Sequence, residues 1–243
     1  MGIVYNNDKG QQYRDDLKQF LQMGLDEQGN PEAELTHKVL FTAYYALGFY
    51  YKRYDQLDNL FNLFEKYGKS FKDDLLSKEV ESWYYRRIGN LKRALFLDRQ
   101  MMQAVSINVN ACPYISFASS VGKLLEIDFD NQLSAKPLEN WKSVDEMKKD
   151  WEQALDAIRS AMEEYQAIRN GKHYGKHYAI EGRLLMYSPE LVHKSMEQVD
   201  AELDRAMKSL NLAIQYENEK EEDYYKRYSE YCHYQQKCNM IRM

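Results

Sequence analysis

The residues best suited to bind a charged ligand lie close together between positions 172 and 183 of the 243-residue chain. Lysine and arginine carry a fixed positive charge, while histidine and tyrosine rings can stack on a planar group or form hydrogen bonds. A helix is predicted to begin near residue 173, and the free amides of a helix start favour an anion. We therefore predict a site for a phosphate or nucleotide ligand formed by Lys172, His173, Lys176, His177, Tyr178 and Arg183.

The same side chains also fit an ordinary packing role, which the sequence leaves open. Long cationic side chains commonly cover helical surfaces, so the lysines fit a solvated turn. Tyr178 and Arg183 would then pack between helices, with Arg183 paired to Glu181 or to an acid on the next helix. A basic surface and a packed helix start are therefore the two interpretations of this segment.

The spacing of the histidines argues against a metal site. His173, His177 and Glu181 follow one another at every fourth position, so they share one face of a helix. The first and last of them are about 12 Å apart along a straight helix, too far for one ion to bridge. No usual zinc-binding spacing relates the members of a second group, Cys232, His233 and Cys238. We predict no metal.

Sequence motifs for catalysis are missing. The chain contains no GxxxxGK[ST], GxGxxG, GxSxG or HExxH pattern. The acids Glu126, Asp128 and Asp130 offer the ligands of a magnesium ion or a pair of catalytic carboxylates, but no basic residue or histidine lies beside them in the sequence. They also fit ordinary acids of a loop. We predict that the chain is not an enzyme and uses no cofactor.

The elements that must position these residues are helices. Only four prolines and eleven glycines interrupt a sequence rich in strong helix formers. Apolar stripes and their capping residues, such as Ser143 with Glu146 and the terminating pair Asn170–Gly171, give the expected boundaries. The predicted helices span about 9–24, 31–52, 55–68, 73–88, 90–105, 110–126, 144–169, 173–187, 195–217 and 221–241.

A degenerate internal repeat indicates how the helices are arranged. The segments around residues 44–67 and 78–102 match at positions 34 residues apart: Tyr51 with Tyr85, Asp55 with Gly89, Leu60 with Ala94, and Phe64 with Asp98. This period is that of the tetratricopeptide helix–turn–helix unit. Two further stripes of small and apolar residues in the second half have the spacing of the second helix of such a unit: Ala154, Ile158 and Ala161, then Ala206, Leu210 and Ala213.

The predicted fold is therefore all-α, a tetratricopeptide-like α-solenoid of antiparallel helix pairs. We expect residues 1–243 to form a single helical repeat domain. The stretch 126–142 lacks a helical stripe and contains Pro137, so it predicts a long loop or a seam between two subdomains.

The 21 tyrosines have two possible uses. At helical spacing they usually form the core between repeats, but they also line grooves that recognise proteins. Stacked helix pairs make extended grooves of this type. We predict that a protein or peptide partner binds on the first helices of the repeats, through Tyr44, Tyr51 and Tyr85.

Several segments of the second half carry a family resemblance: NACPYISFA from residue 110, HYGKHYAIEGRLL at 173–185, AMKSLNLAIQYE at 206–217 and DYYKRYSEYCHYQQ at 223–236. These segments resemble the tetratricopeptide-like C-terminal regions of bacterial signal-transducing and anti-phage defence proteins. The resemblance covers roughly half of the chain and implies a sensor or scaffold that controls an effector domain, whose signatures the sequence lacks. It therefore implies a non-catalytic interaction or sensor module, with a nucleotide-binding regulatory domain at 172–183 as the alternative.

Charge and apolar runs limit the other partners. A net charge of −5 and a pI of about 5.7 give no general attraction to nucleic acid or to anionic membranes. The longest mostly apolar run, 39–51, is shorter than the roughly 20 residues that cross a bilayer. The N-terminus resembles neither a signal peptide nor a lipid anchor, so we predict a cytoplasmic location with reduced cysteines. The poorly capped last helix suggests either a homo-oligomer or a truncated chain.

Overall fold

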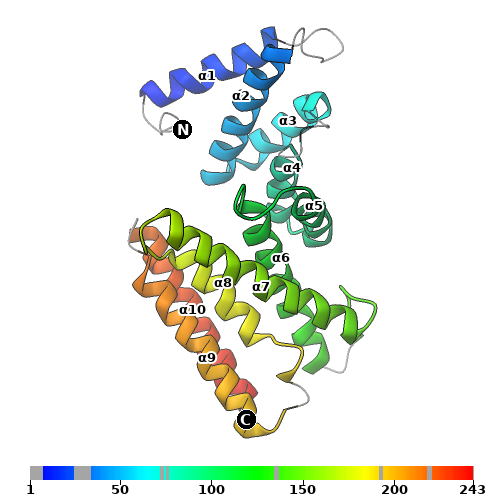
Figure 1. Ribbon diagram of the computed structural model, residues 1–243, viewed down its shortest axis with the longest axis vertical. Helices are drawn as coiled ribbons and strands as arrows, with labels where there is room; N and C mark the ends of the chain where they lie inside the picture. The colour runs from blue at the N-terminus through cyan, green and yellow to red at the C-terminus, as the bar shows by residue number, and fades with distance from the viewer. Residues whose placement is uncertain are drawn as a thin grey trace. The chain divides into compact units, whose positions relative to one another are not determined.

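The fold is entirely helical in the part of the chain that the computed structural model describes (Figure 1). The described residues are 8–24, 34–71, 74, 77–133, 137–191, 194–217 and 221–242. They contain no β-strand, as the all-α prediction requires. The chain divides into two compact units, unit 1 (Met1–Ala104) and unit 2 (Val105–Met243).

Unit 1 consists of five α-helices and one short 3₁₀-helix in its described residues. These are α1 (Asp8–Met23), α2 (Glu34–Arg53), α3 (Leu57–Tyr67), η1 (Gly68–Phe71), α4 (Ser77–Arg87) and α5 (Leu91–Ala104). Each α-helix packs against the next one in the sequence, and α2 also packs against α4. The predicted start of the second helix at residue 31 lies outside the described residues.

The turns of the hairpins α2–α3 and α4–α5 have the same backbone conformation, 34 residues apart. Asp55 and Gly89 both lie in the left-handed region, with φ of 56° and 81°. The amide of Leu57 donates to the carbonyl of Asp55 at 3.1 Å, and the amide of Leu91 donates to Gly89 at 2.8 Å. The left-handed conformation favours glycine and tolerates aspartate. The predicted correspondence of Asp55 with Gly89 is therefore confirmed at the level of the backbone.

The core of unit 1 is built from the apolar stripes of α2, α3 and α4. Leu40, Leu47 and Leu60 are fully buried, and Phe71 of η1 packs on the same cluster. A Cβ atom on Gly48 would lie 2.9 Å from Val80 Cγ1, so the glycine lets α2 approach α4 closely. Small residues on a helix face permit this approach.

Unit 2 contains the remaining five α-helices of the described chain. These are α6 (Cys112–Leu133), α7 (Val144–Ile168), α8 (Gly175–Met186), α9 (Met196–Gln215) and α10 (Glu221–Ile241). Consecutive helices pack against each other, and Figure 1 shows α8, α9 and α10 side by side. In addition, α6 packs against α8, and α8 contacts α10. Consecutive packing thus recurs in both units.

Polar contacts attach α10 to the rest of unit 2. Tyr234 and Cys238 are its buried anchors, with 2% and 1% exposure. Around them lie ion pairs that join the helix to neighbouring segments: Arg227 with Glu217 (3.1 Å), Lys237 with Asp130 (2.6 Å), and Arg242 with Asp200 (2.8 Å) and Asp204 (2.6 Å). The last helix is therefore attached by two buried side chains and by ion pairs around them.

The predicted ends of α7 are confirmed by their contacts. The hydroxyl of Ser143 accepts a hydrogen bond from the amide of Glu146 at 3.2 Å, as an N-cap should. Asn170 and Gly171 follow the helix with φ of 53° and 79°. The other predicted helices agree with the structure to within about four residues at each described end, except at the end of α6.

The prediction that 126–142 is one long loop is wrong for its first part, because α6 continues to Leu133. Asp128, which looked like a loop acid, is fully buried. Its carboxylate accepts hydrogen bonds from the amides of Glu139 at 2.7 Å and Asn140 at 3.0 Å. The carboxylate of Asp128 thus joins the segment after α6 to the helix. Because this buried residue is polar, the sequence shows no continuous apolar stripe here. The division between the two compact units falls between residues 104 and 105.

Among the described residues, no helix is both long and apolar enough to cross a bilayer. The three cysteines are free, with Cys112 exposed, Cys232 partly buried and Cys238 buried.

Candidate functional site

The start of α8 is an aromatic cluster packed between helices of unit 2. The ring of His173 stacks on Tyr216 with a centroid distance of 4.3 Å. Tyr178 Oη lies 2.7 Å from His173 Nδ1, and Gln166 Nε2 lies 3.1 Å from the same nitrogen. If both neighbours donate, His173 Nδ1 is the acceptor and the proton of the neutral ring is on Nε2. His173 and Tyr178 thus each use one ring face to stack on Tyr216.

His177 lies deeper in the same cluster, with 3% exposure. Its ring meets the edges of Tyr165 and Tyr174 at centroid distances of 5.4 and 5.1 Å. Burial, assisted by the charge of Lys176, lowers the pKa of His177 to about 4. At neutral pH the imidazole is therefore uncharged, and it contributes no positive charge to an anion site.

Arg183 lies on a different part of α8 from the histidines, where it meets α6 and α10. Its Nε donates to Tyr234 Oη at 2.5 Å, while carboxylate oxygens of Glu126 and Glu230 lie 3.9 and 3.8 Å away. Burial alone lowers the pKa of Arg183, but Tyr234 and the two carboxylates raise it above its ordinary value. The pairing to acids on neighbouring helices is the packing role that the sequence left open.

The six predicted ligand residues are thus distributed among three environments. His177 and Tyr178 are buried and His173 is partly buried, whereas Arg183 is a cation with 14% of its side chain exposed and acids beside it. Lys172 is exposed on the turn before α8, and Lys176 is partly buried in its first turn. The structure therefore brings two lysines to the start of α8, next to aromatic rings that pack against one another.

The tyrosines predicted to bind a partner lie in or near the core of unit 1. Tyr44 is fully buried and Tyr51 is 4% exposed. Tyr85 is partly buried, with the guanidinium carbon of Arg93 5.8 Å from its ring centre and Phe64 at its edge. Packing therefore accounts for Tyr44 and Tyr51 in this structure.

A different set of residues on α2 and α4 combines one exposed aromatic side chain with partly buried and buried neighbours, and we call it the α2/α4 face: Phe49, Tyr45, Lys52, Glu79 and Trp83. Phe49 is 44% exposed, and its ring meets Trp83 at 6.1 Å. The ammonium of Lys52 lies 4.2 Å from the Trp83 ring centre, a cation–π geometry. The hydroxyl of Tyr45 donates to Glu79 Oε2 at 2.7 Å. Aromatic and cationic groups of this kind dominate protein recognition sites.

Glu79 is the unusual member of this face because it is an acid with 1% exposure. Its Oε1 atom has no hydrogen-bond partner. Burial raises the pKa of Glu79, and the nearby charge of Asp98 acts in the same direction, against Tyr45, Lys52 and Arg86. The burial of Glu79 could not be predicted from the sequence, because a glutamate in a helix is normally solvated.

A second buried acid lies next to it. Asp98 of α5 is fully buried and accepts hydrogen bonds from Ser82 Oγ at 2.6 Å and from Arg86 Nη2 at 2.8 Å. In the predicted tetratricopeptide-like repeat, this position would hold a large aromatic residue. A hydrogen-bonded ion pair between α4 and α5 therefore replaces that ring.

The acids considered for a magnesium site do not converge. Asp128 is bound to backbone amides, and Asp130 pairs with Lys237. Glu126 accepts a hydrogen bond from the hydroxyl of Tyr187 at 3.1 Å. Within the described residues no group of three or more histidines, cysteines or acids is arranged to hold a metal ion.

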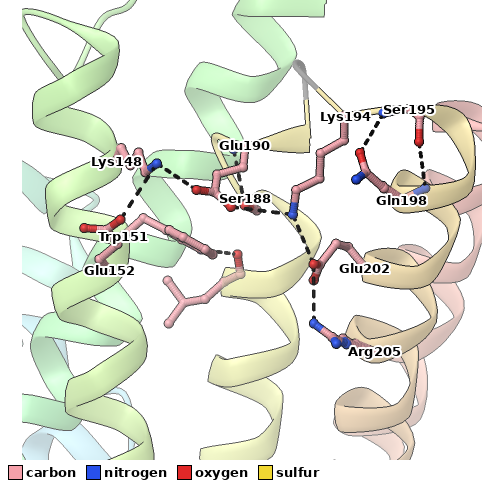
Figure 2. Close-up of polar contacts among 11 residues, drawn as sticks. Lys148, Trp151, Glu152, Ser188, Glu190, Lys194, Ser195, Gln198, Glu202 and Arg205 are labelled. Atoms are coloured by element: carbon pink, nitrogen blue, oxygen red, sulfur yellow. Dashed lines mark hydrogen bonds and ion pairs between the residues drawn. The ribbon is translucent and has the colours of Figure 1, made fainter.

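Figure 2 shows a chain of charged contacts from α7 to α9. Lys148 pairs with Glu190 at 2.8 Å, and Glu190 lies 3.5 Å from Lys194. Lys194 then pairs with Glu202 at 3.0 Å, which also lies 3.4 Å from Arg205. The charges alternate along this series of contacts, so each acid drawn in Figure 2 pairs with at least one cation. Arg205 is its exposed end, with 70% of its side chain accessible.

Beside that end lies an open cavity of about 250 Å³ between α7, α8 and α9. Its lining contains two arginines, one lysine and one acid: Arg159, Arg205, Lys208 and Glu181, with Ser209 and two leucines. Sequence reasoning missed this group because its members come from three helices. The only signal in the sequence was the helical spacing of Arg205, Lys208 and Leu212.

The chain matches no protein-family model, no curated protein and no solved structure. The resemblance to bacterial defence proteins therefore stays a prediction.

Proposed function

We propose that the chain is a non-catalytic interaction module, a tetratricopeptide-like α-solenoid that binds a protein or peptide on the α2/α4 face. The observation that carries this proposal is an exposed aromatic side chain, Phe49, beside a cation stacked on Trp83. A partner that covers Phe49 would remove its apolar surface from water, next to polar groups of the face that are already in position.

Packing of alternate helices supports the solenoid part of the proposal. In a stack of hairpins, the first helix of one pair must contact the first helix of the next pair. The contacts of α2 with α4 and of α6 with α8 have this form. Glycine makes room in both cases: a Cβ on Gly48 would lie 2.9 Å from Val80, and one on Gly122 would lie 3.3 Å from Arg183 Cδ.

The cellular role is a proposal that depends on the sequence resemblance of residues 110–236. A sensor or scaffold region of a bacterial defence protein needs a binding face and no catalytic groups of its own. A cytoplasmic location and self-association belong to the same proposal. Sedimentation of the purified chain tests self-association, since a monomer at all concentrations would contradict it.

Site-specific photocrosslinking tests the partner face. A photoreactive phenylalanine analogue at position 49 should capture one protein partner in cells. The matched control carries the same analogue at Phe96 of α5, which is 49% exposed against 44% for Phe49. Equal capture from the two positions would contradict the assignment of the α2/α4 face.

Binding of the captured partner then gives the quantitative test. Truncating a central aromatic contact typically costs about 2 kcal/mol, so Phe49→Ala should weaken binding roughly 30-fold. Phe96→Ala should leave the affinity within about twofold. Unchanged binding by Phe49→Ala would remove this face from the proposal.

A further inference from the structure

The cavity between α7, α8 and α9 has more positive than negative groups in its lining. Arg159 comes from α7, Glu181 and Leu185 from α8, and Arg205, Lys208, Ser209 and Leu212 from α9. Three cations thus face one acid, on a chain whose net charge is −5. A local excess of this sign on an acidic protein concentrates anions.

The acid in the cavity is already neutralised. Arg159 Nε donates to Glu181 Oε1 at 3.0 Å, and Ser209 Oγ donates to Glu181 Oε2 at 3.0 Å. Only 12% of the Glu181 side chain is exposed. The carboxylate is therefore fixed at the side of the cavity, where its remaining lone pairs can accept hydrogen bonds from a ligand hydroxyl.

The other two cations are weakly held or unpaired. Arg205 reaches Glu202 at only 3.4 Å, and that acid already has Lys194 at 3.0 Å (Figure 2). Among the residues that the structure describes, Lys208 makes no ion pair. Asp204, one turn before it, is taken by Arg242 at 2.6 Å.

Arg205 and Lys208 also repel each other. They lie three positions apart on α9, where side chains are neighbours, and like charges at this spacing are unfavourable. An anion between them would replace that repulsion with two attractions. Arg205 is free to turn toward it, because most of its side chain is accessible.

We infer that this cavity binds a small phosphate monoester, with Arg205 and Lys208 on the phosphate. Arginine binds phosphate oxygens through two parallel hydrogen bonds, and lysine adds a point charge. Leu185 and Leu212 provide an apolar wall for the organic part, and Glu181 accepts its hydroxyl groups. The chemistry is that of a sugar phosphate.

The size of the cavity limits the ligand. About 250 Å³ is slightly below the range of roughly 300–1,000 Å³ that holds drug-sized ligands. A pentose phosphate has the right scale, whereas a dinucleotide would extend into solvent. This site differs in position and in residues from the lysines at the start of α8, and it does not depend on a protein partner at the α2/α4 face.

Calorimetric titration of the full chain with ribose 5-phosphate tests the inference. Binding is expected, inorganic phosphate should compete, and ribose without the phosphate should give no heat. Binding should weaken as salt rises, because the contacts are charged. Absence of heat with ribose 5-phosphate, equal binding of ribose, or tighter binding of phosphoserine than of the sugar phosphate would overturn the assignment.

Variants locate the site. Loss of one charged hydrogen bond corresponds to roughly tenfold weaker binding, which is the expectation for Lys208→Ala and for Arg205→Ala. The matched control is Lys149→Ala, an exposed lysine of α7 that does not line the cavity. Both positions are on the surface, so the fold should persist, and circular dichroism checks this. An equal loss in the control, or no loss in either cavity variant, would overturn the inference.

Amide chemical shifts provide a second readout of position. Addition of ribose 5-phosphate should shift the amides of residues 205–212 on α9. Shifts confined to residues 172–178 would place the anion at the start of α8 and would overturn the cavity assignment.

Discussion

Units 1 and 2 both place charged side chains between packed helices, but the cluster of α4 and α5 and the cluster around Arg183 are built around opposite charges. Unit 1 has two interior carboxylates, Glu79 and Asp98, near a single guanidinium, that of Arg86. In unit 2 the guanidinium of Arg183, whose side chain is 14% exposed, is surrounded by carboxylates and a phenol from α6 and α10. Three acids of the same unit are buried as well: Asp128, Asp150 and Glu217. Similar packing of helix hairpins therefore does not determine which charged side chains lie between the helices.

Each unit also contains one buried group whose contribution to stability should depend on pH, and the two contributions should change in opposite directions. Burial raises the pKa of Glu79 above 4.5, so its contribution to stability is present below that pH and is lost as pH rises through the folded-state pKa. Burial lowers the pKa of His177 to about 4, so its contribution is present above pH 6.5 and is lost as pH falls toward 4. A fall in pH therefore favours the stability of unit 1 through Glu79 and lowers the stability of unit 2 through His177.

The largest expected effect on stability comes from removing the charge of Arg183. Arg183→Met should destabilise that unit by about 3–5 kcal/mol, because it leaves Glu126, Glu230 and Tyr234 without their shared partner. Urea unfolding gives the total loss, and hydrogen exchange of peptides from each unit gives its location. The loss should occur without any ligand, which distinguishes packing from the predicted nucleotide site.

The matched control for Arg183 is a partly exposed pair in the same unit. Lys237 pairs with Asp130 at 2.6 Å, with 21% and 50% of their side chains exposed. Lys237→Met should therefore cost less than about 1 kcal/mol. If the two variants lost equal stability, burial would not be the reason for the importance of Arg183.

The next effect is the pH dependence of unit 2. Wild-type protein should lose up to about 3 kcal/mol of stability between pH 6.5 and 4 through His177, because the unfolded histidine takes up a proton that the folded one resists. His177→Phe keeps a ring between Tyr165 and Tyr174 and removes this dependence. Unfolding curves over that pH range measure it. An unchanged pH profile in the variant would show that other groups cause the acid sensitivity.

Periodicity predicted the helices well, because apolar stripes and caps are local in the sequence. The predicted equivalence of Asp55 and Gly89 also located a turn that occurs in both hairpins. The candidate site was harder, since exposure depends on neighbours that spacing does not identify. Tyr44 and Tyr51 have the spacing of a binding face but lie in the core, and Lys208 meets Arg159 only because α7, α8 and α9 pack together.

A smaller effect of opposite sign is expected in unit 1. Glu79→Gln should stabilise the protein by about 1 kcal/mol at pH 7, because it removes a poorly compensated buried charge and keeps an acceptor for Tyr45. The gain should shrink as pH falls toward 4.5. Thermal unfolding at several pH values measures this difference between variant and wild type.

The control for Glu79 is another glutamate of α4. Glu81 pairs with Arg93 at 3.0 Å near the surface, so Glu81→Gln should cost at most about 0.5 kcal/mol and should gain nothing. Stabilisation by Glu81→Gln, or destabilisation by Glu79→Gln at neutral pH, would contradict the role assigned to the buried acid.

The smallest effect concerns a property that the two units should share. Gly89 in unit 1 and Gly171 in unit 2 have φ of 81° and 79°, and a Cβ atom on either would meet no atom within 4 Å. Alanine at each position is then disfavoured by backbone conformation alone, at about 1 kcal/mol in either unit. Hydrogen exchange should report the loss in unit 1 for Gly89→Ala and in unit 2 for Gly171→Ala. Clearly unequal losses would show that the turns, like the buried charges, differ between the units.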